Sequence, residues 1–152
     1  DAVLSHEIGH LEDAQRYLPL GRHLGAILWN LTRLGFSARR VEEWLELRAE
    51  CVAIARARNP WLALASCASQ LGGGEPTLTL HAGGYRELMV RLVEVLDADP
   101  GAFPSLQRDR VIVQQLDRLS EAELREAARR VLAGLGIDEA DGAVSSRRAE
   151  AR

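Results

Sequence analysis

The residues best suited to chemistry lie at the start of the chain, where two histidines flank a glutamate in the segment HEIGH (His6 to His10). On a helix, residues four apart share one face, which is the separation that two ligands of a single tetrahedral zinc ion need. Glu7 lies beside them and is suited to take a proton from an attacking water and pass it to a leaving amine. A chance HExxH arises in roughly one chain in a hundred of this composition. We therefore expect zinc at His6 and His10 with Glu7 as the catalytic base and acid, in preference to a solvated helix face.

A third zinc ligand must come from another element. No histidine follows at the spacing of a three-histidine site, because positions 16 and 20 are Arg and Leu. Glu42, Glu46 and Glu50 recur every four residues, together with Glu43, and this row alone is also typical of a solvated acidic stripe.

The sequence around this row, ELRAECVA, favours the metal site. Small residues at Ala49 and Ala53 allow close packing against the helix that carries HEIGH. We expect Glu46 to be the third zinc ligand, and Glu50 to accept a hydrogen bond from the far nitrogen of a ligand histidine.

Other chemically interesting side chains have simpler interpretations. His81 and Tyr85 are candidates for stabilising an oxyanion, but their spacing does not place them near zinc, so a surface histidine and a half-buried tyrosine are favoured. Cys51 and Cys67 are too far apart for a CxxC pair, and we expect them to be reduced, buried side chains.

The spacing of apolar residues predicts helices throughout. Ser37, Asn59 and Ser120 are expected to cap three of them, with Glu123 completing a capping box. Residues 75–84 are expected to form a loop. The helices are expected at about residues 2–17, 20–34, 37–58, 61–71, 85–96, 105–119 and 120–134.

Length and composition indicate one all-α domain. A chain of 152 residues can bury a real core, and its low aromatic and high Leu, Ala, Arg and Glu content is typical of helical proteins. We expect a single compact helical domain over residues 1–137 and a flexible polar tail over residues 138–152. The motif begins at residue 6 and the sequence has no initial Met, so we expect this sequence to be a piece of a longer chain.

A net charge of −3 gives no broad attraction for nucleic acid, so we do not expect a nucleic-acid partner. No run of 18 apolar residues occurs, and two cysteines fit a reducing compartment. We expect the protein in the cytoplasm or at the cytoplasmic face of a membrane.

The segments LSHEIGH (residues 4–10) and EWLELRAE (residues 43–50) resemble the HtpX-like and CAAX-prenyl-protease family of zinc metallopeptidases, which are gluzincins. The resemblance extends over residues 2–74, including LGGG at residues 71–74, and more faintly to Phe103 and Pro104. It implies a gluzincin-type core, a peptide or protein substrate, and membrane association through segments outside this chain. The family usually has Asp where Glu50 stands and His where Phe103 stands, so Phe103 is given no catalytic role.

These observations predict a zinc-dependent metalloendopeptidase. The alternative is a non-catalytic, zinc-stapled helical scaffold or sensor with the same ligands, which would not need Glu7. A regulatory protease with one protein substrate would share the chemistry. Neither the substrate nor the oligomeric state follows from the sequence.

Overall fold

A computed structural model describes residues 2–17, 28, 31–32, 35–72 and 80–135. Within these ranges no strand occurs, which confirms the all-α prediction for this part of the chain. Most of the helix expected at residues 20–34 and the tail expected at residues 138–152 lie outside it. The helices are α1 (Ala2–Tyr17), α3 (Ala38–Arg56), α4 (Pro60–Gly72), α5 (Leu80–Ala98) and α6 (Glu121–Gly134), with 3-10 helices η1 (Pro100–Ala102) and η2 (Ile112–Arg118).

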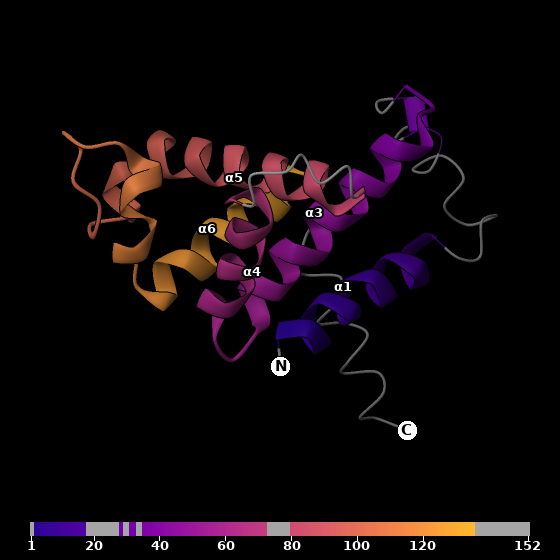
Figure 1. The fold of residues 1–152 in the computed structure, drawn as a ribbon, viewed down its shortest axis with the longest axis horizontal. Coiled ribbons are helices and arrows are strands. Elements are labelled where there is room, and N and C mark those ends of the chain that lie inside the picture. The colour runs from indigo at the N-terminus through magenta and orange to yellow at the C-terminus, as the bar shows by residue number, and fades with distance from the viewer. Residues whose placement is uncertain (1, 18–27, 29–30, 33–34, 73–79, 136–152) are drawn as a thin grey trace.

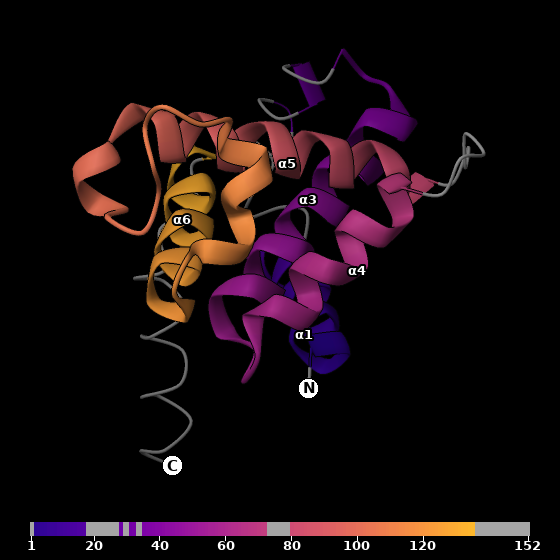
Figure 2. The ribbon, with the colours of Figure 1, turned by 60° about the vertical axis from the view of Figure 1, so that its left-hand side comes forward.

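Helix α3 lies at the centre of the arrangement and contacts α1, α4, α5 and α6. In Figure 1, α1 lies along one side of α3, while α5 and α6 extend from the other. The turned view in Figure 2 shows α4 beside α3, with α5 running across both. The helix that carries the acidic row is therefore the common contact of the other α-helices named above.

Three predicted caps set the helix starts. The Ser37 hydroxyl accepts from the backbone N–H of Arg40, and Asn59 Oδ1 accepts from the N–H of Trp61. Ser120 and Glu123 form the predicted capping box, each bonding the other's backbone. These bonds satisfy N–H groups that have no partner inside the helix, so the three starts agree with the sequence prediction.

The hydrophobic core consists of buried side chains from α3, α4, α5 and α6, together with Phe103. The ring of Phe103 is buried, and the Arg130 guanidinium carbon lies 5.3 Å from its centre. The fully buried large apolar side chains are Leu47, Ile54, Leu88, Leu92, Leu96, Phe103 and Leu124. Burial of such side chains stabilises the fold by roughly 1.5 to 3 kcal/mol each before entropy is subtracted.

Helix α5 begins earlier than predicted. Residues 80–84 were expected in a loop, but they lie inside α5, Gly83 and Gly84 included. A Cβ on Gly84 would lie 2.8 Å from the Glu43 carbonyl oxygen and 2.8 Å from Glu46 Cβ. The glycines therefore permit α5 to approach α3 at the acidic row.

The helix predicted at residues 105–119 is wrong. Residues 104–110 form turns, followed by the 3-10 helix η2. The buried Gln115 amide bonds both the N–H and the carbonyl of Gln107, at 2.7 and 2.9 Å, while Glu123 accepts from the backbone N–H of Ser105 at 3.0 Å. The Gln107 carbonyl, which an α-helix would bond to the N–H of residue 111, is thus occupied by the Gln115 amide.

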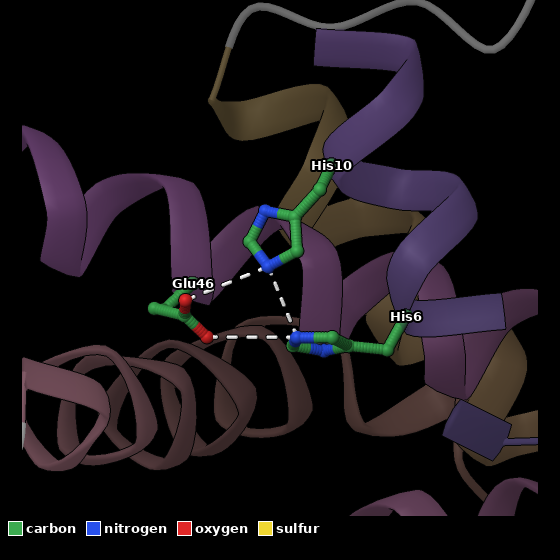
Figure 3. A group of neighbouring side chains, drawn as sticks. All are labelled: His6, His10 and Glu46. Carbon is green, nitrogen blue, oxygen red and sulfur yellow. Dashed lines mark hydrogen bonds and ion pairs between the residues drawn. The ribbon is translucent and has the colours of Figure 1, made fainter. Parts of the chain in front are cut away.

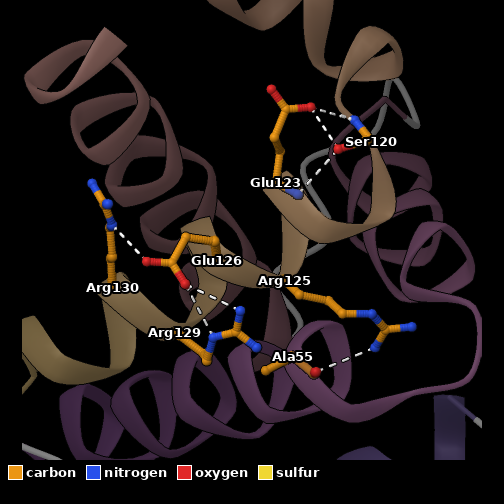
Figure 4. A network of polar contacts seen from close by, with 7 residues as sticks. All are labelled: Ala55, Ser120, Glu123, Arg125, Glu126, Arg129 and Arg130. Carbon is orange, nitrogen blue, oxygen red and sulfur yellow. Dashed lines mark hydrogen bonds and ion pairs between the residues drawn. The ribbon is translucent and has the colours of Figure 1, made fainter. Parts of the chain in front are cut away.

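Polar contacts of α6 attach it to α3 (Figure 4). Arg125 donates to the Ala55 carbonyl at 3.2 Å, near the C-terminal end of α3, where carbonyls have no partner inside the helix. Glu126 accepts from Arg129 and Arg130 on the same helix. The C-terminal end of α3 is thus held by a guanidinium from a distant part of the sequence.

Candidate metal centre

Helices α1 and α3 approach closely at one glycine of the HEIGH motif. A Cβ on Gly9 would lie 2.8 Å from the Cα of Ala49 and 3.3 Å from its Cβ. Gly9 and Ala49 are both buried. The absent side chain at Gly9 and the small one at Ala49 allow the histidines of α1 to reach the carboxylates of α3.

This approach brings His6, His10 and Glu46 together (Figure 3). Nε2 of His6 lies 3.0 Å from Nε2 of His10. The Glu46 carboxylate lies across from the two rings, with Oε2 3.6 Å from Nε2 of His6 and Oε1 3.5 Å from Nε2 of His10. The donor atoms of these three residues form a group suited to hold a metal ion.

The donor distances fit one small tetrahedral cation. Zinc bonds of about 2.05 Å at the tetrahedral angle place neighbouring donors about 3.3 Å apart. The two nitrogens lie 3.0 Å apart, and each lies 3.5 or 3.6 Å from a different oxygen of Glu46, so the separations are close to that value. Two imidazole nitrogens at 3.0 Å also need a proton or a cation between them, because their lone pairs would otherwise face each other.

The Glu50 carboxylate, for which the sequence predicts a supporting role, lies beside Nδ1 of His6. Its Oε1 lies 3.1 Å from Nδ1 of His6, and the Glu50 side chain is buried. A proton on Nδ1 leaves the lone pair of Nε2 free for a metal ion. The bond with Glu50 is the main cause that raises the pKa of His6 above its usual value; burial opposes it, and the charges of Glu46 and Glu7 add to it.

Glu7 lies on the exposed side of α1, next in sequence to His6. Its negative charge is close enough to contribute to the raised pKa of His6. The carboxylate is therefore open to solvent beside the donor group. This position suits a proton carrier better than a ligand, because ligands in such a site converge on one point.

The structure separates the four glutamates of the acidic row. Glu46 and Glu50 face α1, whereas Glu42 is exposed and Glu43 accepts from Arg39 at 2.9 Å. Sequence spacing alone could not distinguish the two glutamates that face α1 from the other two, because all four can lie on one broad face of a helix.

A buried ion pair fixes α1 against α3 beside the site. Arg48 Nη2 lies 2.7 Å from Asp13 Oδ1, and both side chains are about 5% exposed. The guanidinium carbon of Arg48 also lies 4.7 Å from the centre of a Trp44 ring. A second pair, Arg56 with Glu12, joins the same helices at the surface.

Tyr85 is a residue whose place the sequence did not reveal. It is buried, not half-buried. Burial raises its pKa, and the negative charge of Glu50 adds to that rise. Cys67 is buried, as expected, and the charge of Glu50 likewise adds to the effect of burial in raising its thiol pKa. The side chain of His81 lies outside the described residues. The sequence did not indicate that the charge of Glu50 acts on these two buried groups, because the three residues belong to three different helices.

Comparisons of this chain with models of protein families, with curated proteins and with solved structures found no match. Among the helices in the described ranges, none combines the length and the apolar character needed to cross a bilayer.

Proposed function

We propose that this chain is a zinc-dependent metalloendopeptidase domain in which His6, His10 and Glu46 hold the ion. The observation that carries the proposal is the convergence of two imidazole Nε2 atoms and one carboxylate at tetrahedral spacing. A bis-histidine, single-carboxylate set with an open fourth position is typical of catalytic zinc. When bound, zinc supplies a Lewis acid that polarises a carbonyl and makes water more acidic.

The chain's own residues supply the proton transfers. Glu7 accepts a proton from the attacking water as its oxygen bonds to the peptide carbonyl carbon. The same carboxylate then returns that proton to the amide nitrogen, which leaves as an amine when the carbon–nitrogen bond breaks. Glu50 keeps the ring of His6 in one orientation throughout.

The motifs HEIGH and ELRAE support a proposed relationship to the HtpX-like and CAAX-prenyl-protease metallopeptidases, and with it a gluzincin-type core. The proposed substrate is accordingly a peptide or protein, with no nucleic-acid partner, and the proposed setting is the cytoplasm or the cytoplasmic face of a membrane. The packing of Ala49 against Gly9 supports this proposal, because it explains the small residue in ELRAE.

The first experiment measures zinc per chain and hydrolysis of a quenched fluorescent peptide library. We expect about one zinc per wild-type chain, and Glu7→Gln to retain zinc while losing hydrolysis at least about 100-fold, because the proton carrier is gone. Glu46→Gln should weaken zinc binding, because an amide is a poorer ligand than a carboxylate.

The matched control is Glu42→Gln, an exposed glutamate one turn before Glu46 on the same helix. It should leave both zinc content and hydrolysis unchanged. Equal zinc affinity in wild type and Glu46→Gln would contradict the ligand assignment. Zinc binding without hydrolysis in any wild-type assay would instead favour the zinc-stapled scaffold, since the donors come from two helices and would join them.

A further inference from the structure

A pocket of about 240 Å³ lies between the N-terminal half of α3 and α5. Leu135, which follows α6, forms part of its wall. None of the proposed metal donors His6, His10 and Glu46 lines this pocket. It is therefore a second concave site, separate from the metal centre, and the proposed peptide hydrolysis does not use it.

The inner wall of the pocket is apolar. Leu47 and Leu135 both line it and are only 2% and 5% exposed. The indole of Trp44, which is half-buried, forms another part of the lining. Small-molecule sites combine apolar walls of this kind with a few polar groups that orient the ligand. The buried leucines and the indole therefore offer a contact for an apolar group.

The two carboxylates in the lining are each bound by an arginine of the same helix. Glu43 accepts from Nε of Arg39 at 2.9 Å, and Glu87 accepts from Nε of Arg91 at 2.8 Å. These arginines offset the negative charge that the two glutamates bring to the pocket. A cationic ligand therefore meets no uncompensated carboxylate there.

Arg40 gives the lining a positive charge that no carboxylate balances. Within the part of the chain that the structure describes, its guanidinium makes no ion pair. Arg91 bonds Glu87 through Nε, and a guanidinium has further N–H groups that can donate to a second acceptor. A carboxylate in the pocket would thus meet donors from both α3 and α5, in the planar form that suits it.

We propose that this pocket binds a carboxylate that adjoins an apolar group, with Arg40 as the contact of the carboxylate and Trp44 and Leu47 as contacts of the apolar group. The volume of about 240 Å³ lies below the roughly 300 to 1,000 Å³ of drug-sized ligand sites, so the ligand is small. Two sources carry this chemistry: a free aromatic or aliphatic acid, and an aspartate beside an apolar residue in a peptide. Because no metal donor is involved, the inference does not depend on the proposed zinc site.

The test is a fluorine NMR titration of the whole chain with two probes, para-fluorophenylacetate and its neutral amide, para-fluorophenylacetamide. The probes share the ring and differ in charge. We expect the wild type to bind the acid about two- to fivefold more tightly than the amide, which is the range of an exposed ion pair. In Arg40→Gln most of this preference should disappear, because the cation that pairs with the acid is gone.

Arg86→Gln is the matched control. Arg86 lies on α5 next to Glu87, is exposed and does not line the pocket, so this variant loses the same charge without changing the lining. It should keep the preference for the acid. Both arginines are exposed, so neither substitution should disturb the fold, which circular dichroism checks.

Displacement of the acid by an acetylated and amidated peptide with aspartate beside phenylalanine would identify a peptide as the source of the carboxylate. Failure of that peptide to compete would identify a free acid. No binding of the acid by the wild type, or a preference for the acid that Arg40→Gln leaves intact, would overturn the proposal. Equal losses in Arg40→Gln and Arg86→Gln would also overturn it, because they would show a general attraction of charge. Zinc content enters none of these measurements, so their outcome is separate from that of the proposed function.

Discussion

Arg48 and Asp13 form a buried ion pair between the helix that carries the histidines and the helix that carries Glu46. Removing one partner of such a pair leaves a charge without compensation in the interior, which is far more costly than losing an exposed pair. The Arg48–Asp13 pair and the Arg56–Glu12 pair, both between α1 and α3, therefore offer a direct comparison, because the first is buried and the second lies at the surface.

Arg48→Met should lower the free energy of unfolding by about 3 to 5 kcal/mol, because Asp13 stays buried without its guanidinium. Arg56→Met, the control at the surface pair with Glu12, should change it by less than about 1 kcal/mol. Urea denaturation of both variants measures the difference. Equal losses would show that burial does not set the contribution of these pairs.

At the scale of the helix, sequence reasoning succeeded where local chemistry decides. Ser37, Asn59 and Ser120 mark helix starts because their side chains bond nearby backbone N–H groups, and such bonds depend on only a few neighbouring residues. The HEIGH motif can likewise be recognised from its own five residues. Its separation of four residues puts His6 and His10 side by side on any regular helix.

Sequence reasoning failed where distant contacts decide. Residues 80–84 were expected in a loop, but they lie within α5, where Gly83 and Gly84 leave room for the close approach to α3. Residues 105–119 were expected to form a helix, but the Gln115 amide donates to the Gln107 carbonyl that such a helix would use. The burial of Tyr85 in α5 under the influence of Glu50 in α3 was likewise inaccessible, since it depends on how the helices pack.

Gly9→Ala tests the contact between α1 and α3. The added methyl would lie 2.8 Å from the Cα of Ala49, so the helices must separate despite the better helix propensity of alanine. We expect a loss of about 1 to 3 kcal/mol in unfolding free energy and weaker zinc binding. Thermal denaturation and chelator competition measure the two effects.

The control is Gly134→Ala at the end of α6, where an added Cβ meets nothing within 4 Å. It should leave zinc affinity unchanged and keep or slightly raise stability. If Gly9→Ala behaves like this control, the close approach of α1 and α3 does not determine the donor geometry.

At the scale of the whole molecule, stability at acid pH depends on Glu123. Its carboxylate accepts from Ser105 and Ser120, and these hydrogen bonds outweigh burial to lower its pKa from 4.5 to about 2. A lowered folded-state pKa means that the contribution is present above pH 4.5 and is lost as the pH falls toward 2.

Glu123→Gln should therefore cost about 2 kcal/mol at pH 7 and much less at pH 2, where about half of the wild-type carboxylate is itself protonated. Urea denaturation across this pH range measures the difference. Glu94→Gln, an exposed site on α5, is the control and should follow the wild type. A constant cost at all pH values would contradict the assigned role of the ionised carboxylate.

The position of α1 at the outer side of α3 bears on how fast a bound ion could leave (Figure 1). Two of the three proposed ligands, His6 and His10, belong to α1, and the third, Glu46, belongs to α3. One opening motion of α1 would remove both imidazoles at once, so ion release would be governed by the rate of helix detachment and not by successive ligand exchange. The buried ion pair of Arg48 and Asp13, which holds α1 on α3, would then slow the release of the metal ion.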